Sequence, residues 1–155
     1  MWAAPAAGGG NDPRIQTIYR AAAAALTGTT IQNVVGMSFP VVALGTYIFT
    51  MYIDVTAVTG TSPTHNYSFA LPTGYTRFMA KRTQMTSATA QVTSVVTGTA
   101  GFGAGAVVAN IKTILEGIIV VGATGGTVQL QVTQGGTAPT VTLGAGSGGF
   151  AMKTA

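Results

Sequence analysis

The stretch that most constrains the fold is GTVQLQVTQGGTAPTVTLGAGSGG, from Gly126 to Gly149. Apolar and polar residues alternate in GTVQLQVTQ, a Gly-Gly pair interrupts the pattern, and the alternation resumes in TAPTVTLGAG. Successive side chains of a β-strand point to opposite faces, so this period of two predicts strands with one buried face. The stretch holds no charged residue, histidine or cysteine, which predicts a role in sheet and interface rather than in chemistry.

Similar patterns run from Thr30 through most of the chain. The segment Thr46–Val58 is rich in the aromatic and β-branched residues that favour strands. Its apolar residues on one side are Tyr47, Phe49, Met51 and Ile53. Ile48, Tyr52 and Val55 indicate that both sides carry apolar groups, which is typical of a strand buried on both faces.

Glycine and proline divide the chain into roughly eight to ten short strands. We expect a loop at Gly60–Asn66 and a break between strands at Glu116–Gly117. Short, evenly spaced strands with few helices predict an all-β protein built as a sandwich or barrel. The chain of 155 residues is expected to form one such domain.

The N-terminal segment differs from the rest. Residues 1–29 are predicted to form an arm, and residues 30–155 the β-sandwich domain. An alanine-rich run follows Asp12 and Pro13, a capping residue and a first-turn residue, so a helix over Pro13–Leu26 is one interpretation. The alternative is an extended arm that leads into a first strand.

Charged residues are only 6% of the chain, against about 25% in ordinary soluble domains. Such a composition indicates a surface covered by neighbouring subunits or by hydroxyl groups. The one basic cluster is Arg77, Lys81 and Arg82, too few cations on one face to favour nucleic acid. No segment predicts a membrane span, and MWAAPAAGGG does not resemble a secretory signal.

Few residues could carry chemistry. The acids are Asp12, Asp54 and Glu116, the only histidine is His65, and there is no cysteine. His65 lies in the expected loop and is expected to face solvent. We therefore predict no catalytic residue, no cofactor and no metal site, and no enzyme activity, which would require Asp54, Glu116 and His65 to share one cleft.

Two other patterns have structural explanations. The glycine run at Gly101–Gly105 lacks the strand-then-helix context of phosphate-binding loops and is interpreted as a connector. The aromatic residues of the strands could form a carbohydrate platform, but a sandwich core explains them better. They are Tyr47, Phe49, Tyr52, Tyr67, Phe69, Tyr75 and Phe78.

Ordered motifs over about Thr30–Ser147 resemble virion proteins of tailed bacteriophages. These proteins share a recurrent element that is similar to ILEGIIVVGATGGTVQLQVTQGGTAPTVTLGAGS. In this element a strand that ends in glycine is followed by a small-residue turn, then by a G-T-x-Q-L-Q strand, and then by a T-V-x-x-G-S strand. Two earlier segments of the chain are also similar to upstream segments of these virion proteins, namely TTIQNVVGMSFPVVALGTYIFTMYIDVTAVTG and NYSFALPTGYTRF. The chain departs from the pattern at Gly148-Gly149-Phe150, where the family often has an aromatic strand.

The resemblance implies a jelly-roll-like antiparallel β-sandwich that forms trimers similar to those of tumour necrosis factor. It implies a capsid decoration (cement) or head-fibre protein on the phage surface, made in the bacterial cytoplasm, that binds the major capsid protein or another virion protein through its arm. A tail-associated receptor- or carbohydrate-binding module is the alternative, using Tyr67, Tyr75 or His65. The candidate interface residues are Trp2, Pro5, Arg14, Ile15, Ile18, Tyr19, Gln129 and Gln131.

Overall fold

The computed structural model describes residues 14–85, 90–98, 101–103, 105–106 and 111–155. All regular elements of these residues are β-strands with antiparallel neighbours, which confirms the expected fold class. The strands are β1 (Ile15–Tyr19), β2 (Ala24–Thr27), β3 (Gln32–Val41), β4 (Thr46–Ala70), β5 (Tyr75–Met85), β6 (Gln91–Thr97), β7 (Gly105–Ala106), β8 (Ile111–Val121), β9 (Gly126–Leu143) and β10 (Gly148–Lys153).

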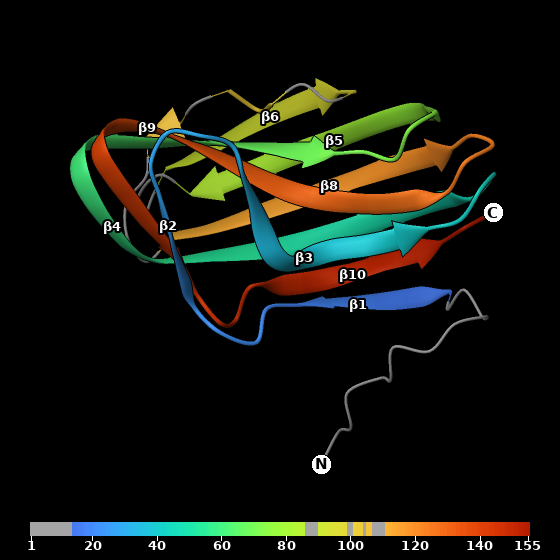
Figure 1. The fold of residues 1–155 in the computed structure, drawn as a ribbon, viewed down its shortest axis with the longest axis horizontal. Helices are drawn as coiled ribbons and strands as arrows, with labels where there is room; N and C mark the ends of the chain where they lie inside the picture. Colours follow the sequence, from blue (N-terminus) through green and yellow to red (C-terminus); the bar gives the residue numbers. More distant parts are fainter. Residues whose placement is uncertain (1–13, 86–89, 99–100, 104, 107–110) are drawn as a thin grey trace, which may run out of the picture.

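The strands form two layers that share β4 (Figure 1). In the first layer the order is β1-β10-β4-β8-β5-β6, and β4 contributes residues 46–55. In the second layer β9 pairs on one side with residues 55–70 of β4, and on the other side with β3 and β2. The short β7 pairs with β4 at Thr64 and His65. The core lies between these layers.

The prediction of a loop at Gly60–Asn66 is wrong, because β4 continues through these residues. Threonines on both sides of Gly60 are β-branched and favour a strand, and β9 offers a complete pairing partner along this stretch. The register shifts between Val55 and Ala57, and twice more between Thr59 and Thr64. Such bulges bend a strand, which is how β4 curves from one layer to the other (Figure 1).

An aromatic cluster forms the centre of the core. The Phe49 ring lies 5.5 Å from Phe39, 5.3 Å from Phe69 and 6.0 Å from Phe78, measured between ring centroids. Val128, Leu130 and Val132 of β9 are buried, as their alternation predicts. Of the aromatic residues named from the sequence, the buried ones are Tyr47, Phe49, Tyr67, Phe69 and Phe78.

The helix interpretation of Pro13–Leu26 is wrong for the described part of that segment. β1 pairs with β10, and β2 pairs with the end of β9, so residues of the predicted arm complete both layers. The backbone hydrogen bonds and burial gained in these pairs outweigh the intrinsic helix propensity of alanine, which is small per residue. Residues 1–13 lie outside the described residues.

Glycines let neighbouring strands approach closely. The break expected at Glu116–Gly117 is wrong, because β8 runs through it. A Cβ at Gly117 would lie 2.5 Å from the Phe49 ring and 2.6 Å from the Met79 carbonyl oxygen. At Gly149 a Cβ would lie 1.9 Å from the Thr50 carbonyl oxygen, so the unusual Gly-Gly start of β10 is what allows it to fit between β1 and β4.

Candidate assembly surface

The first layer has an outer face, turned away from the core, on which apolar side chains line up across neighbouring strands. One row follows the register from Ile15 through Met152, Ile48 and Ile118 to Met79. A second row contains Tyr19, Gly148, Tyr52 and Ile114. A third runs from Thr17 through Phe150, Thr50, Glu116 and Lys81 to Val95. We call this surface the outer face throughout.

Much of the outer face is accessible to solvent. Tyr19 is 62% exposed, Tyr52 50% and Phe150 41%, and Ile15, Ile48 and Val95 are exposed as well. With roughly 200 Å² for one aromatic side chain, these three rings alone present about 300 Å². The aliphatic residues enlarge the patch into the range of about 300–600 Å² found for the largest patches of soluble monomers, which are often functional.

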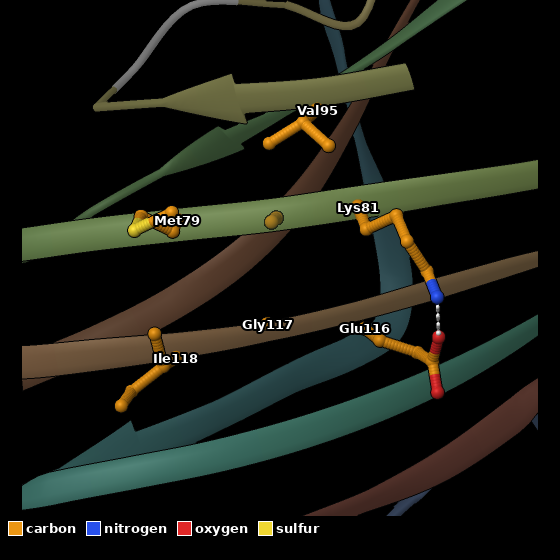
Figure 2. A pocket seen from close by; sticks show the side chains of 7 residues that line it. Met79, Lys81, Val95, Glu116, Gly117 and Ile118 are labelled. Carbon is orange, nitrogen blue, oxygen red and sulfur yellow. Dashed lines mark ion pairs between the residues drawn. The ribbon is translucent and has the colours of Figure 1, made fainter. Parts of the chain in front are cut away.

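A shallow depression of about 450 Å³ lies on the outer face between β5, β8 and β6. Figure 2 shows Met79, Ile118 and Val95 around it, with Lys81 and Glu116 pointing toward one another at one end. The Lys81 ammonium lies 2.9 Å from the Glu116 carboxylate, and both side chains are about half exposed. An exposed pair contributes little to stability, so its main effect is to leave this apolar area without net charge.

The predicted N-terminal interface residues divide between the two sides of β1. Ile15 and Tyr19 lie on the outer face, whereas Ile18 is buried in the core. Arg14 is exposed beside the C-terminal residues Lys153 to Ala155. Trp2 and Pro5 lie outside the described residues. The strand period therefore assigns only alternate residues of β1 to a possible partner.

Gln129 and Gln131 use their amides within the chain. Gln129 Nε2 donates to the carbonyl oxygens of Val34, Met37 and Leu130, and Gln131 Nε2 donates to Asn33 Oδ1. Between Asn33 and Ser38 the register of β3 against β9 shifts, so Gln129 supplies a donor where the strand pairing is interrupted. Contact of these residues with a partner chain stays a prediction.

The prediction that His65 faces solvent from a loop is wrong. His65 lies in β4, is 1% exposed, and its ring centroid lies 4.4 Å from that of Tyr67. Burial, and then the nearby Arg82 charge, lower the pKa of His65 to about 3, so the imidazole is neutral at pH 7. The two buried rings also cannot serve as surface ligands for a receptor or a carbohydrate.

The other candidate residues for chemistry lie elsewhere. Glu116 and Asp54 are on the outer face, where Glu116 binds Lys81 and Asp54 stands opposite Lys112. The structure does not bring either carboxylate to His65, which faces the interior. The basic cluster is also divided, because Arg77 is exposed, Lys81 is bound to Glu116, and Arg82 is buried.

Sequence reasoning did not count Ile48, Tyr52, Ile118 or Phe150 among the candidate interface residues. The available signal was the apolar alternation on both sides of Thr46–Val58, which indicates a second face in need of cover. Only the strand order shows which residues of β1, β8 and β10 join that face, because neighbours such as Ile15 and Met152 lie near opposite ends of the chain. Val55 belongs to the core side, where it is fully buried.

Comparison with known proteins adds no relative: no family model matches the sequence, and no curated protein matches it either. Within the described ranges, histidines and acids do not gather in a group of three or more that could hold a metal ion. The same ranges contain no helix with the length and hydropathy needed to cross a membrane.

Proposed function

We propose that this protein is a structural component of a bacteriophage virion, a capsid decoration or head-fibre protein whose copies assemble through the outer face. The observation that carries the proposal is the exposed, largely apolar surface formed by β1, β10, β4 and β8. The resemblance noted in the sequence supports the virion setting and the trimer. The low content of charged residues supports an assembled state, because a surface with few charges is poorly suited to an isolated soluble subunit.

The mechanism of such a protein is burial of surface rather than chemistry. Two or three copies that bury their outer faces remove Tyr19, Tyr52 and Phe150 from water, at about 25 cal/mol per Å² of apolar area. Glu116 lies between Ile118 and Ile114 on the outer face, and its pairing with Lys81 lowers the cost of covering both charges. We assign attachment to the shell to residues 1–13, because β1 and β2 of the predicted arm belong to the two layers.

The oligomeric state tests this proposal through one paired substitution. Ile48 lies in the middle of the outer face, and Ile48→Glu places a carboxylate where a partner is expected, at a high desolvation cost. Ile31, immediately before β3 of the second layer, is the same residue type and more exposed, so Ile31→Glu is the matched control. Light scattering should give three times 15.5 kDa for the unmodified chain and for Ile31→Glu, and a smaller mass for Ile48→Glu.

A monomeric mass for the unmodified chain at all concentrations would contradict assembly through this face. Circular dichroism of each variant distinguishes lost assembly from lost folding. Deletion of residues 1–13 should keep the oligomer and abolish attachment to phage shells. The deletion must stop there, because removal of β1 would expose the edge of β10.

The exposed rings of Tyr19, Tyr52 and Phe150 favour one second candidate, a carbohydrate-binding surface, since aromatic faces stack on sugar rings. The two functions require opposite states of the same face. A monomer that binds glycans, and loses them with Tyr52→Ala, would support the binding module. An oligomer in which position 52 is buried would exclude that role for this face.

A further inference from the structure

A group of polar side chains lies inside the sandwich, between the two layers. It comprises His65 and Tyr67 of β4, Arg82 of β5, Thr113 of β8 and Gln134 of β9, all at most 4% exposed, and we call it the interior polar cluster. His65 stands directly opposite Gln134 in the β4–β9 register. The charge of Arg82 acts on both His65 and Tyr67, and Tyr67 lies beside Thr113. Proposed assembly through the outer face makes no use of this cluster.

Hydrogen bonding within the protein does not satisfy the cluster. Both imidazole nitrogens of His65, both amide atoms of Gln134 and Arg82 Nε are buried without a hydrogen-bond partner. The hydroxyl oxygens of Tyr67 and Thr113 are also buried without a hydrogen-bond partner. Each buried group left unsatisfied costs about 1–3 kcal/mol. Because a native domain has only about 5–15 kcal/mol of net stability, so many unmet groups in one place indicate a bound species.

The charge of the cluster indicates what kind of species completes it. Arg82 Nη1 donates to the Gly103 carbonyl oxygen at 3.1 Å, and its guanidinium carbon lies 5.8 Å from the centre of the Phe102 ring. Within the described ranges Arg82 has no carboxylate partner, because Glu116 and Asp54 lie on the other side of the sheet. A buried positive charge without a counter-charge is costly, and an anion removes that cost.

The donors present also suit an anion. Arg82 Nε and the Gln134 amide nitrogen carry hydrogens, and a neutral imidazole has one N–H donor. The second imidazole nitrogen is an acceptor, to which the Tyr67 or Thr113 hydroxyl can donate a hydrogen bond. An acceptor-only ion can therefore take hydrogen bonds from three residues at once. The close packing of the layers favours a small ion over an organic carboxylate or a phosphate.

We propose that the interior polar cluster binds one small monovalent anion of the halide class, held by Arg82, His65 and Gln134. The exposed Gly103, whose carbonyl oxygen Arg82 binds, marks the side of the cluster nearest to solvent. The site is independent of the outer face. A monomeric chain can bind the ion, and an oligomer can lack it, so the two proposals fail separately.

Thermal unfolding at constant ionic strength tests the site. A ligand that binds only the folded chain raises Tm with its concentration. We expect Tm to rise as sodium chloride or bromide replaces sodium methanesulfonate, whose anion is larger. Arg82→Gln should abolish this rise, whereas Arg77→Gln, which removes an exposed arginine of the same strand, should retain it. Equal responses of the two variants, or the same Tm in all three salts, would overturn the proposal.

A second measurement does not depend on the folding of Arg82→Gln. Crystals of the unmodified protein grown in bromide should give an anomalous peak within hydrogen-bond distance of Arg82 Nε and the Gln134 amide. Two results would refute the site. One is bromide at the surface alone, which would be an adventitious ion only, and the other is a water molecule at this position in the presence of bromide.

Discussion

Acidification should destabilise the protein through His65 alone between pH 7.5 and pH 5. The folded-state pKa of His65 is lowered from 6.5 to about 3, by burial first and by Arg82 second. Between these values the unfolded chain binds more protons than the folded one, so the free energy of unfolding falls as the pH falls. The full contribution is present above pH 6.5 and is lost progressively toward pH 3. Each pH unit in this window corresponds to 1.36 kcal/mol, so the loss at pH 5 is about 2 kcal/mol.

Urea unfolding at pH 7.5, 6.0 and 5.0 and at fixed protein concentration measures this loss. His65 is the only histidine in the chain, so no other side chain has an ordinary pKa inside the window. His65→Gln, which cannot be protonated, is the control and should show a nearly flat profile. NMR titration of the imidazole in the unmodified protein gives the pKa directly. A pKa near 6.5, or the same pH profile for both proteins, would refute the burial argument.

Two substitutions test the core and the irregular β3–β9 pairing. Phe49→Ala removes the ring that contacts Phe39, Phe69 and Phe78, and should lower the free energy of unfolding by about 3–5 kcal/mol in urea titrations; a loss below 1 kcal/mol would contradict the cluster. Gln129→Ala leaves the Val34 and Met37 carbonyls without this donor and should cost about 1–3 kcal/mol. Its control is Gln131→Ala, whose bond to Asn33 is exposed, so thermal melts should rank the two variants clearly.

The local alternation of apolar and polar residues was sufficient to predict the all-β fold class. The alternation in Gly126–Leu143 places Val128, Leu130 and Val132 in the core because a strand has a strict period of two. The positions at which strands bend or end could not be predicted from this alternation. Gly60 and Gly117 look like interruptions in the sequence, yet one sits in a bulged strand and the other lets Phe49 approach β8. Both outcomes depend on neighbours distant in sequence.

The candidate site was predictable only in part. The exposed positions of Ile15 and Tyr19 follow from the alternation of β1, but the alanines after them predicted a helix until pairing with β9 is considered. His65 was misplaced because Gly60, Pro63 and Asn66 in the same stretch are typical of loops. Burial among polar groups from three other strands is a property of the tertiary structure, and a single sequence carries no signal for it.

The central claim is that copies of this chain meet through the outer face, and thiol accessibility tests it most directly. The chain contains no cysteine, so Tyr52→Cys introduces one thiol on the outer face, and Ile31→Cys introduces one of similar exposure immediately before β3 of the second layer. With a bulky thiol reagent under native conditions, the account predicts slow labelling at position 52, fast labelling at position 31, and equal rates in denaturant. Equally fast native labelling at both positions would contradict it.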